Sequence, residues 1–122
     1  MAFGLSPKHI QDFPIENLTP EQFFVLAIEA AKELDWNIGY TSETEFIAYT
    51  KFSMRSWSEE VKIKIIGNNA NMKSECTGSQ MVDWGKNKEN IESLIRTLNR
   101  LKKARTPEEL EQKYEELKQT MH

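Results

Sequence analysis

The chain has 122 residues, 39% hydrophobic residues with 12 aromatic side chains among them, and a formal net charge of −3. This length fits one domain, and the aromatic content favours a folded core over a disordered chain. The longest hydrophobic run, Phe23 to Ile28, has six residues, whereas a membrane-spanning helix needs about 20. We therefore expect no direct membrane insertion, and the acidic balance argues against a nucleic-acid partner.

The first helix is predicted by a capping phrase that follows an irregular N-terminal arm. Residues 1–18 show no clean hydrophobic period but hold several large apolar side chains, so we expect this arm to pack partly on the domain. Thr19 is then the predicted N-cap, Pro20 the first helical residue, and Gln22 the residue that reaches back to the cap amide. The apolar face that follows predicts a helix over residues 20–34.

Alternating residues after this helix predict strands over 36–40 and 45–52. The next two strands are expected to form a hairpin whose turn is Asn68-Asn69, because asparagine tolerates left-handed backbone conformations. The register that follows pairs the inward residues of the two strands: Ile65 with Met72, Ile63 with Ser74, and Val61 with Cys76. Cys76 then lies on the core side, as a small buried hydrophobe rather than a reactive thiol.

Two helices are predicted at the C-terminal end. Hydrophobic residues recur at helical spacing from Ile91 to Leu101, and a second capping phrase, Thr106-Pro107-Glu108-Glu109, opens the last helix. That last helix has only a narrow apolar seam of Leu110, Tyr114 and Leu117, with Met121 as a further candidate. The stretch 86–105 carries 7 basic and 2 acidic residues, hence +5, which we interpret as a solvated face with cations near a helix C-terminus.

These elements predict an α+β fold with the order α-β-β-β-β-α-α. An N-terminal helix, a four-stranded antiparallel meander and two C-terminal helices are expected, with helices packed on one sheet face. The predicted organisation is an arm over 1–18, a core domain over 19–105, and a C-terminal helix over 106–122 that could connect to a downstream membrane region.

No catalytic, metal or cofactor site is expected in this chain. Catalysis needs a nucleophile beside a base, paired carboxylates in a cleft, or a metal. The only histidines, His9 and His122, lie near the chain ends, and one cysteine with two histidines cannot form a zinc site. Glu59 and Glu60 are adjacent and point to opposite faces of a strand. A small enzyme would therefore need an activity that survives removal of both histidines.

Aromatic residues in predicted loops suggest a binding patch. The chain has more aromatic residues than one sheet face usually covers, and two tryptophans fall outside the predicted strands. The simpler interpretation is that the aromatic residues belong to the core. The alternative is an exposed patch or shallow pocket for a partner. The residues of this patch are Trp57, Gln80, Met81, Asp83 and Trp84.

Three segments carry a family resemblance: Asn37 to Thr50 (NIGYTSETEFIAYT), Ser74 to Gln80 (SECTGSQ) and Asp83 to Asn87 (DWGKN). With the opening Phe3 to His9, they resemble the soluble N-terminal domain of bacterial rhomboid-family proteins, the intramembrane serine proteases. The resemblance covers nearly the whole chain. It includes no catalytic motif, because the G-x-S-G serine and the histidine of that family lie on transmembrane helices that this sequence lacks.

The resemblance implies a non-catalytic accessory or regulatory domain, located in the cytoplasm at the inner face of the bacterial membrane. Its expected partners are the transmembrane part of its own parent chain or a cytosolic protein. The alternative is a free-standing module that binds a small ligand or a protein through the aromatic loop patch. A reading frame that continues past His122 into apolar spans would support the first interpretation, and a natural stop there the second.

Overall fold

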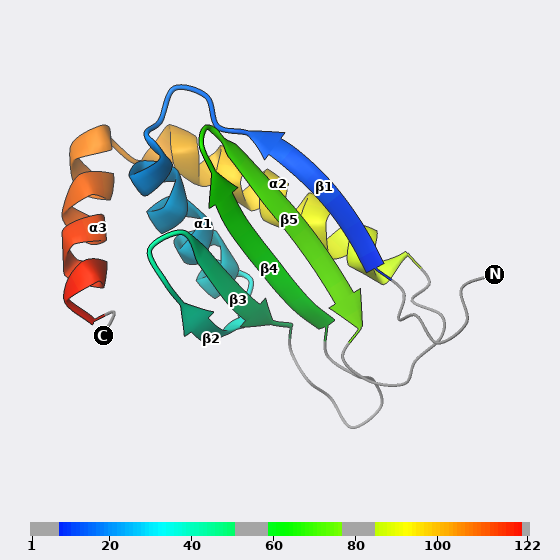
Figure 1. Cartoon of the computed structure of the whole chain (residues 1–122). Coiled ribbons are helices and arrows are strands. Elements are labelled where there is room, and N and C mark those ends of the chain that lie inside the picture. The colour runs from blue at the N-terminus through cyan, green and yellow to red at the C-terminus, as the bar shows by residue number, and fades with distance from the viewer. Residues whose placement is uncertain (1–7, 51–58, 77–84, 121–122) are drawn as a thin grey trace.

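The structure, a computed structural model, describes residues 8–50, 59–76 and 85–120 (Figure 1). The fold is α+β, as predicted. Within the described residues it has five strands and three helices, which are in chain order β1 (Lys8–Pro14), α1 (Pro20–Glu33), β2 (Asn37–Thr41), β3 (Glu45–Tyr49), β4 (Glu59–Ile66), β5 (Asn69–Cys76), α2 (Lys86–Ala104) and α3 (Pro107–Thr120).

The strands form one antiparallel sheet in the order β1-β5-β4-β3-β2. The predicted four-stranded meander therefore lacked one strand, because β1 lies in the N-terminal arm and pairs with β5 along its whole length. The sequence hid β1 because apolar and polar residues are mixed on both of its faces. Half-buried His9 and Gln11 face the helices, while the apolar Ile10 is 52% exposed on the other face.

Two helices cover one face of the sheet, and no described helix covers the other face, called the open face below (Figure 1). The covered face holds alternate residues of each strand, among them Phe46, Val61, Ile63 and Met72, all fully buried. The third helix, α3, packs on α1 rather than on the sheet, and Leu110 is its one buried residue among those described. An antiparallel sheet with one solvated face normally shows this alternation.

Both capping phrases form as predicted. Thr19 Oγ1 accepts from the Gln22 amide at 3.0 Å, and Gln22 Oε1 accepts from the Thr19 amide at 3.0 Å. The second box repeats this arrangement: Thr106 Oγ1 accepts from the Glu109 amide at 3.2 Å, and Glu109 Oε1 accepts from the Thr106 amide at 2.9 Å. Such caps depend on residues three positions apart, so sequence alone is enough to find them.

The predicted β4–β5 register is wrong by two residues. The turn is Gly67-Asn68 rather than Asn68-Asn69, so Ile65 lies opposite Ala70 and Ile63 opposite Met72. Gly67 has a φ of +60° and occupies the first central position, where a type II′ turn requires glycine. A slip of two residues keeps each side chain on its face, which is why the inward and outward residues were still predicted correctly.

Candidate functional site

The predicted patch of Trp57, Gln80, Met81, Asp83 and Trp84 lies entirely outside the described residues. The patch residues belong to segments 51–58 and 77–84. The residues that flank these segments are described, and Thr50, Glu59 and Cys76 lie together at one end of the sheet. The Thr50 amide donates to the Glu59 carbonyl at 3.0 Å, and Glu59 lies directly opposite Cys76. A buried group of polar side chains occupies this end of the sheet.

Glu59 is the centre of this group, with only 1% of its surface exposed. Its Oε1 atom accepts hydrogen bonds from Thr50 Oγ1 and from Asn90 Nδ2, both at 3.0 Å. Its backbone amide donates to Thr50 Oγ1 at 2.8 Å. A buried carboxylate costs free energy unless it is hydrogen-bonded and paired with a cation. Lys86 supplies the cation, with Nζ at 3.9 Å from Glu59 Oε2.

The hydrogen bonds continue from Glu59 into β5 and the first turns of α2. Asn90 Nδ2 also donates to Ser74 Oγ at 3.2 Å, and Ser74 Oγ donates to Asn87 Oδ1 at 2.7 Å. Asn87 Nδ2 then lies 3.6 Å from Cys76 Sγ. We call this group the Glu59 network, and its members are Thr50, Glu59, Ser74, Cys76, Lys86, Asn87 and Asn90.

The Glu59 network fixes three elements, β4, β5 and α2, to one another and to Thr50, the residue after β3. It joins the residue after β3, the start of β4, the end of β5 and the start of α2, and its donors and acceptors satisfy one another inside the core. Ser74 and Asn87 are fully buried and Cys76 is nearly so. Neither the hydroxyl nor the thiol is therefore open to a substrate. Among the described residues, no group of three or more His, Cys, Asp or Glu side chains could hold a metal ion.

The sequence placed Ser74 and Cys76 on the core side, but it did not predict the hydrogen-bonded network that joins them to Glu59. The burial of Glu59 could have been predicted from the sequence, because Glu59 lies two and four residues before the inward-facing Val61 and Ile63 and so faces the same side of the strand. A carboxylate at an inward position requires partners. The partners could not be found from sequence, because Asn87 and Asn90 come from a helix that contacts the strand only in three dimensions.

Several basic residues of the 86–105 stretch form contacts with other parts of the chain. Arg105 binds Glu29 of α1 with two nitrogens, Nη2 to Oε2 at 2.6 Å and Nε to Oε2 at 3.2 Å. This pairing raises the pKa of Arg105. Arg100 pairs with Glu33, and Lys102 donates to the Glu16 carbonyl at 2.7 Å. These contacts tie α2 to α1 and to the segment after β1, which reduces the charge available to an anionic partner.

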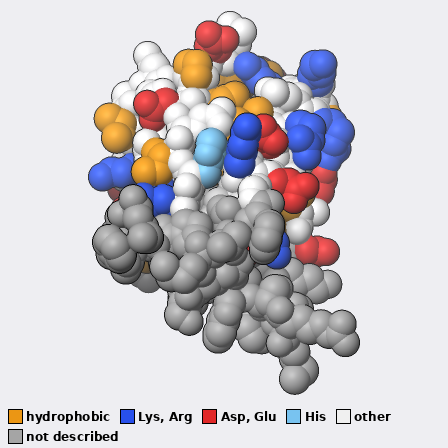
Figure 2. All heavy atoms as spheres, turned by 90° about the vertical axis from the view of Figure 1, so that its right-hand side faces the viewer, with side chains coloured by type: hydrophobic (Ala, Val, Ile, Leu, Met, Phe, Trp, Pro, Cys, Tyr) orange, Lys and Arg blue, Asp and Glu red, His pale blue; other side chains and the backbone are white. Residues whose placement is uncertain are grey.

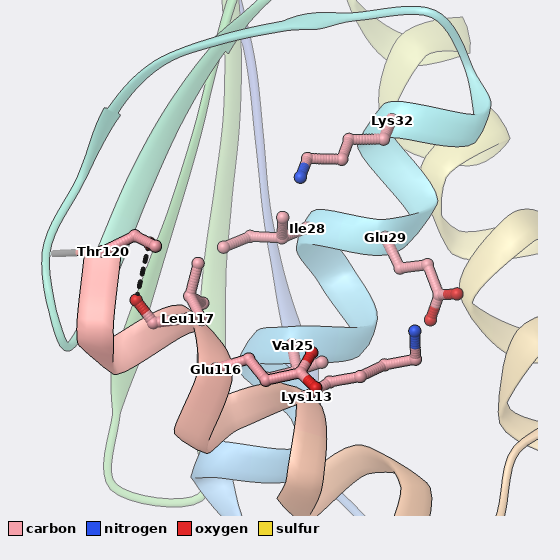
Figure 3. Close-up of a pocket in the computed structure, with 8 residues that line it drawn as sticks. All are labelled: Val25, Ile28, Glu29, Lys32, Lys113, Glu116, Leu117 and Thr120. Carbon is pink, nitrogen blue, oxygen red and sulfur yellow. Dashed lines mark hydrogen bonds between the residues drawn. The ribbon is translucent and has the colours of Figure 1, made fainter.

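A shallow groove of about 410 Å³ lies between α1 and α3 (Figure 3). Ile28 of α1 and Leu117 of α3 point into it, above Val25, and Lys32 and Lys113 lie on its rim. A second hollow, of about 920 Å³, lies between α3 and the β2–β3 hairpin and shares Leu117 and Thr120 with the first. Both exist because α3 contacts α1 through a narrow seam and leaves space on either side.

Comparisons with known proteins add little to this geometry. No family model matches the chain, and no curated protein matches its sequence. Among solved structures, the chain is similar to a TBP-like protein from Parabacteroides distasonis, with a TM-score of 0.40 and 17% sequence identity over 62% of this chain and 56% of that chain. A similarity at this level supports no functional argument. In the described part of the chain, no helix has the length and apolar character needed to cross a bilayer.

Proposed function

We propose that this chain is a non-catalytic accessory domain of a rhomboid-like intramembrane serine protease, acting at the cytosolic face of a bacterial membrane. Hydrolysis would belong to a membrane-embedded part that this sequence does not contain. The proposed partner is that membrane part or a cytosolic protein, which the domain would hold near the protease.

One observation carries this proposal. The three segments that carry the family resemblance are separate in the sequence, and each contributes a residue to the Glu59 network. Thr50 ends the first segment, Ser74 and Cys76 belong to the second, and Asn87 belongs to the third. If this chain shares its fold with the N-terminal domains of rhomboid-family proteins, the similar segments should meet in the folded structure, and residues of all three segments do meet in the Glu59 network.

The burial of the polar side chains in the Glu59 network supports a non-catalytic role. A nucleophile must reach its substrate and must lie within hydrogen-bond reach of a base. In the Glu59 network, the Ser74 hydroxyl is buried and donates to an amide oxygen, and the buried Glu59 carboxylate accepts from Thr50 and Asn90 and is paired with Lys86. Such an arrangement holds backbone segments in place and leaves no group free to attack a substrate.

The first test is the reading frame after residue 122 in the parent gene. Apolar spans that include a G-x-S-G segment would support the proposal, and an immediate stop codon would contradict it. The second test compares the membrane part with and without residues 1–122, in vesicles, on a fluorogenic transmembrane peptide. We expect the serine chemistry to persist without this domain at a changed rate, and no turnover by the purified domain alone.

A free-standing binding module is the second candidate, and the groove between α1 and α3 favours it (Figure 3). Its apolar floor is bordered by two lysines and two glutamates, Lys32, Lys113, Glu29 and Glu116. Apolar pockets with a few polar groups are typical ligand sites. Replacing Leu117 by Lys would fill and charge this groove without touching the Glu59 network. If the Leu117→Lys variant no longer binds a ligand that the native chain binds, and the Glu59→Gln variant still binds it, the binding site is the groove.

A further inference from the structure

The strand β1 is one end of the described sheet, and no other described element pairs with its outer edge. It is the more regular of the two terminal strands, since all seven residues pair with β5 without interruption, whereas β2 has a register shift between Ile38 and Tyr40. Figure 2 looks onto the β1 side of the molecule and shows hydrophobic, basic and acidic side chains interspersed there. An uncovered edge strand is a template for a further strand.

The backbone hydrogen bonds between β1 and β5 show which residues of β1 direct their backbone groups toward the outer edge. The Ile15 amide donates to the Asn68 carbonyl at 2.8 Å, continuing the β1–β5 register. In antiparallel pairs, hydrogen-bonded and non-hydrogen-bonded residues alternate. The backbone groups of His9, Gln11 and Phe13 therefore face β5, and those of Lys8, Ile10 and Asp12 face outward.

We propose that a second copy of this chain pairs with β1 in antiparallel orientation, about a two-fold axis at Ile10. Ile10 of each copy would lie opposite Ile10 of the other, and Lys8 of each would lie opposite Asp12 of the other. Each of these three pairs exchanges two backbone hydrogen bonds. The two sheets then continue as one across the axis. This proposal stands independently of the accessory role proposed above.

The side chains on the open face select this register. Ile10 is 52% exposed, and the pairing covers it with an identical apolar side chain between two opposite-charge pairs, which stabilise antiparallel strands. The Asp12 carboxylate accepts one hydrogen bond, from Asn71 Nδ2 at 3.0 Å, and has further acceptor positions for a lysine. Glu75, the neighbour of Lys8 on β5, is already paired with Lys73 at 3.5 Å.

The alternative two-fold registers are less favourable. Moving the axis to Gln11 would place Ile10 opposite Asp12 and Lys8 opposite Pro14, which has no amide hydrogen to donate. Moving the axis to Asp12 would place two like charges directly opposite each other, which destabilises strand pairing. Edge pairing buries less area than the roughly 1,200–2,000 Å² of a stable interface. The dimer is therefore concentration-dependent.

Sedimentation velocity over micromolar to millimolar concentrations tests the proposal. The native chain dimerises as concentration rises. Asp12→Lys places two lysines opposite each other at both ends of the pairing and raises the dissociation constant about tenfold. The double variant Lys8→Asp with Asp12→Lys restores opposite charges and returns the constant to near the native value. Glu43→Lys, the same charge change in the β2–β3 turn, leaves it unchanged.

A second measurement tests the register and does not depend on affinity. Ile10→Cys should form an intermolecular disulfide under mild oxidation, whereas Asp12→Cys should not, because residue 12 faces residue 8. A native chain that stays monomeric at every concentration overturns the proposal. So does an Asp12→Lys variant that behaves like Glu43→Lys, or cross-linking that is equal at positions 10 and 12.

Discussion

The Glu59 end of the sheet and the helix α3 are held to the core in different ways. Around Glu59, polar groups from three elements satisfy one another in the interior, so removing one of them leaves others unpaired. The helix α3 is held to α1 by one buried leucine, two half-buried side chains and a hydrogen bond from Gln22 Nε2 to Glu111 Oε1 at 3.3 Å. We therefore expect the Glu59 end of the sheet to unfold only together with the whole domain, and α3 to detach while the rest of the domain stays folded.

The largest expected effect comes from Glu59→Ala. The change leaves the donors Asn90 Nδ2 and Thr50 Oγ1 without their shared acceptor, and each buried polar group left unsatisfied costs about 1–3 kcal/mol. Thermal unfolding followed by circular dichroism should show one cooperative transition at a much lower Tm.

Glu60→Ala is the matched control for that variant, because Glu60 is the next residue and lies half-buried on the open face. Its change in unfolding free energy should stay under about 1 kcal/mol. Equal losses in the two variants would mean that the buried network contributes nothing specific.

Leu110→Ala should have the next largest effect, confined to α3. Truncating a fully buried leucine costs about 2–3 kcal/mol, and this cost falls on the contact between α3 and α1. Hydrogen exchange should accelerate across 107–120 and stay slow in β4 and β5. Leu98→Ala, in α2, is the comparison: exchange should accelerate throughout the sheet. Uniform acceleration in both variants would show that α3 unfolds only with the rest.

The two capping boxes offer a smaller test of the same difference. Replacing the N-cap threonine by alanine removes about 1 kcal/mol from a helix. Thr19→Ala should lower the Tm of the whole domain, because α1 is part of the core, whereas Thr106→Ala should mainly lower the helical protection of α3. The reverse pattern, measured by exchange and by Tm, would contradict the proposed difference between the two regions.

Acidification should have the smallest effect. The Glu109 carboxylate accepts a hydrogen bond from the Thr106 amide, and this bond lowers the pKa of Glu109. A pKa lowered in the folded state contributes stability that is complete above the unfolded pKa, about 4.3, and is lost as pH falls through the folded value. Exchange protection of α3 should therefore weaken in that acidic range in the native chain. Glu109→Gln keeps an acceptor without a titrating group and should lose less.

Sequence patterns predicted what depends on neighbours in the chain. The capping boxes, the helix starting at Pro107 and the inward parity of Val61 and Ile63 follow from spacings of two to four residues. The α+β class follows from these elements. The strand β1 was missed because two of its inward side chains, His9 and Gln11, are polar. The turn was misplaced because Gly67 was overlooked in favour of two asparagines.

The candidate site was harder to predict than the fold. The partners of Glu59 lie 9 to 31 residues away in sequence, and no local pattern reports which amide reaches a given carboxylate. The predicted aromatic patch lies outside the described residues and remains a prediction.

The ion pair between Arg105 and Glu29 has a mechanical consequence for α3. Arg105 is the last residue before the capping box of α3, and its two-nitrogen contact fastens that corner to α1. The helix beyond it has 14 residues, or about 20 Å at 1.5 Å per residue. A tilt of about 10° at the corner would displace the far turn by roughly 3–4 Å over such a length. If the Leu110 contact is lost, α3 stays anchored at Arg105 and its far turn is the part that moves most.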